Sequence, residues 1–452
     1  MLAYSATALP INALLAPNTV SIAGSSTVLP IAQEAATTFP TYWNSLVAAN
    51  PSWGTTAALD ISTMNIQGFG SGTALPAILP TTGNGGGSVA TADIGEMSRP
   101  PTDAEWGQTN SGNVQIWAVG VDSVAIVYSK DMTWAPLDLT ALQVAQLFES
   151  TDKAGTTPIY TTWGQFLTAY YAPSAVPTTI NGVTITTAMM NTAITRIVRD
   201  PTSGTYDCFN NFFAKKLNSA EATNAQGAVT GSQWMAPYTE AEGNPDVVTD
   251  MQTATGSIAF ISLGYYLQNE AIMIPVDIYN ANALTGSSPG QPAGYYLPSQ
   301  ADVIAGTYTP YRWLWEVTPS TIPTTGANLA EGVWIAYMKA DAGTAGSNPN
   351  FVTDNAYMAM PRAAMAGGQV LDSNLASYTP LAGQTQTVPR LTVDANDFFY
   401  FTDAYIAYYT NHVYNPYADI TAQGTINGGS FLAFLSDYVY YFTTYAPTHQ
   451  SG

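Results

Sequence analysis

Three short segments carry the residue types that bind a small anion: Gly24–Pro30, Gly68–Thr73 and Arg199–Tyr206. Each runs from a strand-like stretch through small hydroxyl residues into a helical pattern. A helix N-terminus presents backbone N–H groups that lack partners within the helix, together with the positive end of the helix dipole. Serine and threonine hydroxyls add donors, and glycine lets the anion approach the backbone. Taken alone, each segment is more simply explained as an ordinary helix cap.

The third segment differs from the other two because it contains an arginine. Arg199 precedes Ser203-Gly204-Thr205 in a chain with only 11 Lys and Arg residues. A guanidinium offers a planar fork of donors that matches an oxyanion. The alternative is a structural ion pair with the adjacent Asp200. Both interpretations remain open at this point.

Other kinds of chemistry lack the residues that they need. The only histidines, His412 and His449, lie near the C-terminal end, so the main part of the chain has neither a Ser-His-Asp arrangement nor a His/Cys metal cluster. The lone Cys208 cannot form an internal disulfide and is expected in the core. The glycine-rich run at 83–87 is not a phosphate loop, because no Lys-Ser/Thr follows it. We therefore expect a binding protein without catalytic residues, metal or cofactor.

The composition excludes nucleic acid as a partner. The 452 residues include 31 acidic and 11 basic ones, giving a formal net charge of −20, and only 9% are charged. A nucleic-acid surface needs dense Lys and Arg. The polar surface must consist mainly of Ser, Thr, Asn, Gln and Tyr, which stay hydrated at any pH. We hypothesise that the protein faces an acidic exterior, where carboxylates are largely neutral and ion pairs contribute little. No run approaches the ~20 apolar residues of a membrane helix. A soluble, already processed, extracellular or cell-surface protein is expected.

The elements that must position these segments alternate between strand-like and helical patterns. Residues 21–24 and 59–66 are strand-like, and helical patterns begin at Ile31 and Thr73. Residues 112–129 alternate like one long strand or two in succession, suited to carrying the chain between lobes. The length exceeds one hydrophobic core, so an α/β protein of two lobes is predicted. Further elements are a helix at 139–150, a buried strand entering a helix at 255–267, and a helix at 328–340.

In order along the chain, these motifs resemble the phosphate-binding proteins of ABC transporters, which have the type II periplasmic-binding-protein fold. The resemblance covers about residues 20–366 and implies a two-lobed α/β fold with the ligand cleft between the lobes. Lobe 1 would comprise residues 1–121 and 286–366, and lobe 2 residues 122–285. The matching motifs are IAGSSTVLPIAQ, GFGSGTALPAIL, ADIGEMSRPPTDAEW, RDPTSGTYDCFNNFF and TGSIAFISLGYY, with LTALQVAQLFES, Thr162-Trp163 and AYMAMPRAAM (356–365) as further similarities.

The resemblance also implies which residues bind the anion. Thr27 and Val28 would supply hydroxyl and backbone donors, and Ser71 would cap the next helix onto the ligand. Lobe 2 would close on it with Arg199 and the 203–205 run. The full predicted set is Thr27, Val28, Ser71, Ser98, Arg199, Ser203, Gly204 and Thr205, supported by Ser26, Gly72 and Asp200.

Ser98 is the position where family members differ. Some have aspartate there, and others have Ser-Arg, as in this chain's Ser98-Arg99. An aspartate only accepts hydrogen bonds, so it takes the proton of phosphate and repels fully deprotonated sulfate, whereas a serine hydroxyl donates to either anion. Glu96 and Asp200 are candidate substitutes for the acceptor. The implied ligand is inorganic phosphate or a related tetrahedral oxyanion.

After about residue 366 the sequence becomes dense in Tyr and Phe, and residues 367–452 are predicted to form a C-terminal appendage. The aromatic runs at 398–417 and 431–445 either pack on the second lobe or form an exposed surface for partner subunits or the cell envelope. The first function hypothesis is capture of the anion for the membrane permease of an ABC importer. The alternative is a surface-layer or filament subunit on the same fold, self-assembling through this region. An acid phosphatase-like enzyme is disfavoured because the nucleophile–base pair is missing.

Overall fold

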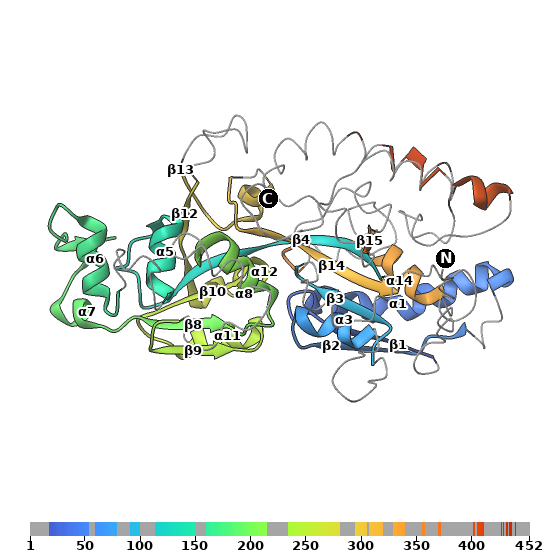
Figure 1. Cartoon of the computed structure of the whole chain (residues 1–452), viewed down its shortest axis with the longest axis horizontal. Helices are drawn as coiled ribbons and strands as arrows, with labels where there is room; N and C mark the ends of the chain where they lie inside the picture. Colours follow the sequence, from blue (N-terminus) through green and yellow to red (C-terminus); the bar gives the residue numbers. More distant parts are fainter. Residues whose placement is uncertain are drawn as a thin grey trace, which may run out of the picture.

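The computed structural model of the chain is organised around one long twisted sheet (Figure 1). The ten strands of this sheet run in the order β2-β1-β3-β14-β4-β10-β8-β9, and β11 and β15 also pair with β4. The residues that the structure describes are 18–53, 59–78, 91–99, 114–149, 160–214, 234–280, 294–304, 307–319, 329–339, 355–357 and short pieces between 369 and 439.

One half of the sheet is built on parallel strands. β1 (Thr19–Gly24) pairs in parallel with β2 (Thr63–Gly68) and β3 (Ile94–Met97). The helices α1 (Leu29–Ala49), α3 (Ala74–Ile78) and α14 (Leu329–Lys339) pack around these strands (Figure 1). Parallel neighbours require helical crossovers, which is why strand-like and helical patterns alternate in the sequence. α1 and α14 meet through an edge-on contact of the Phe39 and Trp334 rings, whose centroids are 5.1 Å apart.

The other half repeats this arrangement. β8 (Thr195–Arg199) pairs in parallel with β9 (Tyr238–Ala241) and with β10 (Ser257–Ser262). α5 (Ala141–Phe148), α8 (Gly204–Phe209), α11 (Asn244–Thr253) and α12 (Leu263–Gln268) surround these strands, and α6 (Trp163–Tyr171) and α7 (Thr187–Asn191) lie at the far end (Figure 1). Stacked aromatic rings form its core, with the Phe209 and Phe260 centroids 4.3 Å apart. Offset and edge-on ring pairs of this kind add to the burial energy.

Two long antiparallel strands, β4 and β14, join the halves. β4 (Val114–Ser129) extends as one strand from one half into the other, and β14 (Tyr311–Pro319) pairs with it, with an irregularity between Leu314 and Trp315 (Figure 1). Of the two interpretations of 112–129, the single long strand is correct, and it does run between the two groups of elements. The division into lobes at 121/122 and 285/286 stays a prediction.

Smaller elements complete the described fold. β12 (Asp277–Asn280) pairs with β5 (Asp138–Leu139) and β13 (Gly294–Tyr296), and β6 (Thr179–Ile180) pairs with β7 (Val183–Thr184). The others are β11 (Met273–Pro275), α13 (Gln300–Ile304) and the short helices η1 (Pro51–Trp53), η2 (Ser71–Thr73), η3 (Asn210–Ala214) and η4 (Glu270–Ile272).

Most predicted elements are present, with shifted ends. The second strand begins at Thr63 rather than at 59, and the helix expected from Thr73 is the five-residue α3 preceded by η2. The C-terminal region contributes β15 (Gln369–Leu371), which pairs with β4. The two aromatic runs at 398–417 and 431–445 lie mostly outside the described residues, so neither interpretation of them is tested. No helix in the described ranges is both long and apolar enough to cross a membrane.

Candidate anion-binding site

Arg199 stands at the carboxyl end of β8 and is fully buried. Its guanidinium donates to backbone carbonyls at one side, Ala241 at 3.2 Å and Glu242 at 2.7 Å. On the other side it donates to the Asn244 side chain at 2.8 Å and to the Thr205 hydroxyl at 3.3 Å. These contacts fix the plane of the guanidinium where the helices α8 and α11 begin.

The alternative role for Arg199, a structural pair with Asp200, is secondary in the structure. The closest approach is 3.7 Å, between Nη2 of Arg199 and Oδ2 of Asp200. The other carboxylate oxygen of Asp200 accepts from the backbone N–H of Thr202 at 2.9 Å and from its hydroxyl. Burial is the main cause that lowers the pKa of Arg199 to about 10, while Asp200 opposes this shift and Arg312 contributes to it. Arg199 is still a cation at physiological pH.

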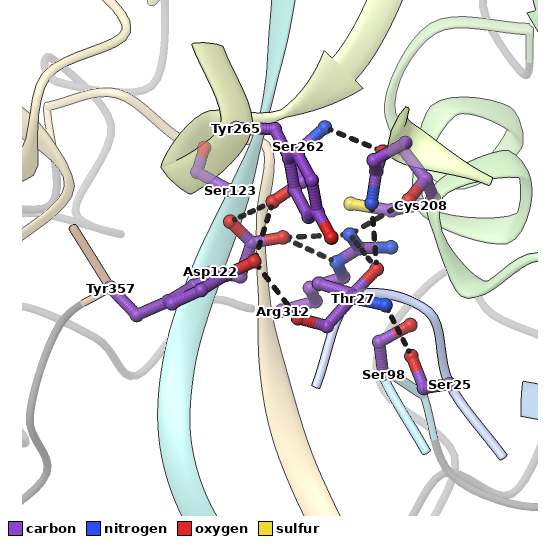
Figure 2. A network of polar contacts seen from close by, with 12 residues as sticks. Ser25, Thr27, Ser98, Asp122, Ser123, Cys208, Ser262, Tyr265, Arg312 and Tyr357 are labelled. Carbon is purple, nitrogen blue, oxygen red and sulfur yellow. Dashed lines mark hydrogen bonds and ion pairs between the residues drawn. The ribbon is translucent and has the colours of Figure 1, made fainter. Parts of the chain in front are cut away.

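A second guanidinium, that of Arg312 on β14, meets Arg199 at this place. Arg312 is the register partner of Asp122 on β4, so the two residues lie opposite each other on the strands that join the halves. Nη2 and Nε of Arg312 are 2.6 and 3.1 Å from Oδ2 of Asp122. The Oδ1 atom of Asp122 accepts from the Ser262 hydroxyl at 2.9 Å. Figure 2 shows this network.

Two threonine hydroxyls accept from Arg312, and that of Thr205 also joins it to Arg199. Nη2 of Arg312 is 3.1 Å from the Thr27 hydroxyl and 2.8 Å from that of Thr205. The Thr205 hydroxyl also accepts from Arg199, and that of Thr27 from Nδ2 of Asn244 at 3.2 Å. Thr27 and Thr205 therefore approach the same guanidinium from the two halves of the sheet. This convergence brings together predicted ligand residues that are 178 positions apart.

Two tyrosines hold the Thr27 loop against β10 and α12. The Tyr357 hydroxyl donates to the carbonyl of Thr27 at 2.8 Å, and the Tyr265 hydroxyl to that of Ser26 at 3.4 Å. The Ser26 side chain accepts from Arg199 at 3.3 Å, so this predicted supporting residue touches the site. Val28 is buried, and its N–H donates to the carbonyl of Ser25 at 3.1 Å. The Val28 amide is therefore engaged within its own turn.

The second glycine-rich segment lies against the start of α8. The Ser71 hydroxyl accepts from the Ser98 backbone N–H at 3.0 Å and lies 3.1 Å from the Ser98 hydroxyl. A Cβ added at Gly204 would lie 2.1 Å from that hydroxyl, so glycine is required for this approach. Gly72 donates its N–H to the Thr202 carbonyl at 3.3 Å.

Ser71 and Ser203 differ in how they act at their helices. Ser71 is the first residue of η2, where it makes no side-chain cap bond, and its hydroxyl instead holds the Ser98 segment. Ser203 is the N-cap of α8 and accepts from the Thr205 N–H at 3.1 Å. Both serines are buried, so their hydroxyls lie within the site rather than on the surface.

The two proposed substitute acceptors are placed differently. Asp200 is engaged by Thr202 through Oδ1 only, and its buried Oδ2, 3.7 Å from Arg199, has no hydrogen-bond partner. The Glu96 side chain lies on β3 opposite Glu316 of β14. Cys208 is buried as expected, and burial raises its pKa to about 12, which keeps the thiol protonated. Among the described residues, no three His, Cys, Asp or Glu side chains gather as a metal cluster would require.

Sequence reasoning missed Arg312, Asp122 and Asn244. Charged residues within apolar strand patterns were the available signal, since Arg312 interrupts YRWLWEV (311–317) and Asp122 interrupts the run at 114–129. A charge in a strand that is buried on both faces needs a buried partner. Which charge pairs with which depends on the register of β4 and β14, which the sequence does not specify.

A family comparison decides the membership of the chain. A model described as a PBP superfamily domain matches residues 13–338. The chain belongs to the PBP superfamily. This confirms the predicted periplasmic-binding-protein fold, and the matched span agrees closely with the resemblance stated for residues 20–366. Among curated proteins, no sequence matches significantly.

Solved structures resemble the chain at low sequence identity. They include a possible phosphate-binding protein from Planctomyces limnophilus (18% identity, TM-score 0.40, 75% of this chain and 92% of the other). A putative phosphate ABC transporter substrate-binding protein from Clostridium perfringens has 15% identity, a TM-score of 0.47 and coverages of 76% and 99%. An ABC-type phosphate transport receptor from Vibrio cholerae has 15% identity, a TM-score of 0.43 and coverages of 75% and 99%.

Proposed function

We propose that this PBP-superfamily protein binds inorganic phosphate, or a related tetrahedral oxyanion, where Thr27, Thr205 and Arg199 converge. The observation that carries the proposal is that both threonine hydroxyls and two guanidiniums meet within hydrogen-bonding distance between the two halves of the sheet. Guanidinium groups and hydroxyls are the donors that oxyanions take in proteins. The predicted ligand residues Ser26, Ser71, Ser98, Ser203 and Gly204 surround this point.

The proposal assigns no chemistry to the bound anion. Binding proteins of two lobes hold their ligand between facing surfaces, and here hydrogen bonds from Arg199 to Ser26 and from Asn244 to Thr27 link those surfaces. Delivery of the anion to the membrane permease of an ABC importer is part of the proposal, supported by the resemblance of the sequence motifs. The alternative of a surface-layer or filament subunit stays a prediction, because the aromatic runs on which it depends lie mostly outside the described residues.

We also propose an extracellular or cell-surface location in acidic surroundings. Support comes from three buried carboxyls, those of Glu96, Glu316 and Glu331, whose pKa values burial raises. Such groups favour the folded state when they are protonated, which acidic surroundings promote. The low content of charged residues supports the same proposal, because ion pairs contribute little where carboxylates are neutral.

Oxyanion binding should raise the melting temperature. A ligand at a hundred times its dissociation constant adds about 2.7 kcal/mol to the free energy of unfolding. Calorimetry or dye-monitored melting in anion-free buffer, with phosphate, arsenate, sulfate and molybdate added one at a time at equal ionic strength, measures the shift. Chloride is the matched control. A melting temperature that none of the four anions moves would contradict the proposed function.

Replacing Ser98 by aspartate should restrict the site to protonated phosphate. The buried carboxylate would face the anion, and a fully deprotonated sulfate would leave like charges adjacent, costing about 1–3 kcal/mol or more. At neutral pH we expect Ser98→Asp to lose sulfate affinity while keeping phosphate, with Ser98→Asn as the size-matched uncharged control. Competition titrations measure the ratio, and in strong acid the difference should shrink because the new carboxyl is itself protonated. A parent that already excludes sulfate as strongly as the variant would show that another group discriminates.

A further inference from the structure

Arg312 has a donor that its structural role leaves unused. Its side chain is only 6% exposed, and the Asp122 carboxylate engages Nε and Nη2 but not Nη1. Nη1 is buried and has no hydrogen-bond partner. An unpaired buried donor on a cation costs more than an ordinary one, so the position requires an explanation.

The other contacts of Arg312 indicate what kind of group its Nη1 atom would bind. Its Nη2 atom contacts the hydroxyls of Thr27 and Thr205, both in the predicted ligand set. Arg312 therefore contacts the site from β14, whereas Thr27 and Thr205 belong to segments that lead into helices (Figure 2). It was absent from the set that the motifs implied.

The charge balance of the cluster favours a doubly charged ligand. The positive charges of Arg199 and Arg312 repel each other, although burial is the main cause of the lowered pKa of Arg199. Asp122 neutralises one of the two cations, and Asp200 approaches the other only to 3.7 Å. The oxygens of Asp122 already accept from Arg312 and Ser262, while Ser98 offers a hydroxyl rather than a carboxylate. The cluster is therefore rich in donors. Of the carboxylates of Asp122 and Asp200, only Oδ2 of Asp200 lacks a hydrogen-bond partner, and it lies 3.7 Å from the Arg199 cation.

We propose that Arg312 is a direct anion ligand and that it makes the site select tetrahedral dianions without relying on a ligand proton. The class comprises sulfate-like dianions and the hydrogen phosphate dianion. This inference rests on the proposed function and assigns to that site a residue and a charge state that the motifs do not. Asp122 acts as a positioning residue, because its carboxylate binds Nε and Nη2 and so fixes the orientation of the guanidinium, with Nη1 directed away from the ion pair.

The experiment removes the ion pair without leaving a buried charge unpaired. The double variant Arg312→Gln/Asp122→Asn keeps hydrogen-bonding groups in both strands, and Asp122→Asn alone keeps the cation. We expect the double variant to lose at least tenfold in sulfate and phosphate affinity by isothermal titration, while Asp122→Asn, which keeps the cation, binds both anions more tightly than the double variant does. Circular dichroism and melting curves confirm that each variant is folded. A double variant with parental affinity would show that Arg312 is only a structural partner of Asp122.

A separate measurement tests the proposed preference for dianions. Sulfate has the same charge throughout the neutral range, so the ratio of phosphate to sulfate affinity cancels any pH effect on the protein. We expect this ratio to rise with pH as phosphate becomes a dianion. A falling ratio would overturn the selectivity. If the parent binds no oxyanion, the proposed function fails together with this inference, whereas parental binding by the double variant removes the inference alone.

Discussion

Substituting Arg199 by alanine should abolish most of the anion affinity. Truncating one partner of a buried charge-assisted contact costs about 2–5 kcal/mol, which corresponds to roughly a 30-fold to several-thousand-fold weaker dissociation constant. Arg199 is fully buried and contacts Thr205 and Ser26, one from each half of the sheet. Its loss therefore removes a charge and also a link between the two surfaces. Isothermal titration with phosphate and sulfate measures the effect.

Arg196 provides a matched control on the same strand. It is equally buried, but its guanidinium donates to the carbonyls of Leu147, Ile194 and Tyr160 and not to the site. Arg196→Lys should lower the melting temperature and leave the anion affinity of the folded protein unchanged. Arg199→Lys keeps the charge but loses the planar set of guanidinium N–H donors, so an intermediate affinity is expected. Binding by Arg199→Ala within twofold of the parent would exclude Arg199 from the site.

The stability of the protein should fall steeply as pH rises from acid toward neutral. Glu96 and Glu316 are register partners on β3 and β14, and both are fully buried. Their four carboxyl oxygens make no ordinary hydrogen bond, and the Trp334 indole favours an ionised Glu316 less than burial and Glu96 disfavour it. Burial raises the pKa of Glu96 from 4.5 to about 8, and that of Glu316 well above its usual range, with the neighbouring Glu96 raising it further. Opposed carboxyls without a cation cannot both ionise cheaply.

The direction of this pH effect on stability follows from the number of protons that the folded and unfolded states bind. Between about 4.5 and about 8, Glu96 of the unfolded chain has lost its proton while Glu96 of the folded protein retains it. The unfolded state then binds fewer protons, so stability decreases with rising pH, by about 1.4 kcal/mol per pH unit for each such group. The contribution is fully present below the unfolded pKa and is lost as pH rises through the folded one. Glu331 on α14 adds in the same direction, since burial and Asp93 raise its pKa.

Denaturant unfolding across about pH 4 to 8 measures this slope. The variant Glu96→Gln/Glu316→Gln should flatten the profile and be more stable than the parent at neutral pH, because it carries no ionisable group between the strands. Glu270→Gln, at an exposed position of η4, is the matched control and should follow the parent. A parent whose stability rises between acid and neutral pH, or a double variant with the parental slope, would contradict the prediction.

The sequence by itself determined the class of fold and named most of the residues that meet in the candidate site. Local signals carried this information, because glycine, serine and threonine at a strand-to-helix junction and the alternation along 112–129 depend on neighbouring residues only. Arg199 and Thr205 could be named because they stand only six positions apart, at the end of β8 and in the first turn of α8. The α/β class followed from the alternation of strand-like and helical patterns.

Only the tertiary structure decided which charges meet. Arg312 joins Asp122 because β14 and β4 pair antiparallel in one particular register, and a shift of β14 by one residue would turn Arg312 to the face opposite Asp122. The same pairing of β14 with β3 places Glu316 opposite Glu96. Register is a property of strands that are nearly 200 residues apart in sequence, and no local pattern encodes it. The second cation of the site and the buried carboxyl pair therefore became visible only when the strands were placed side by side.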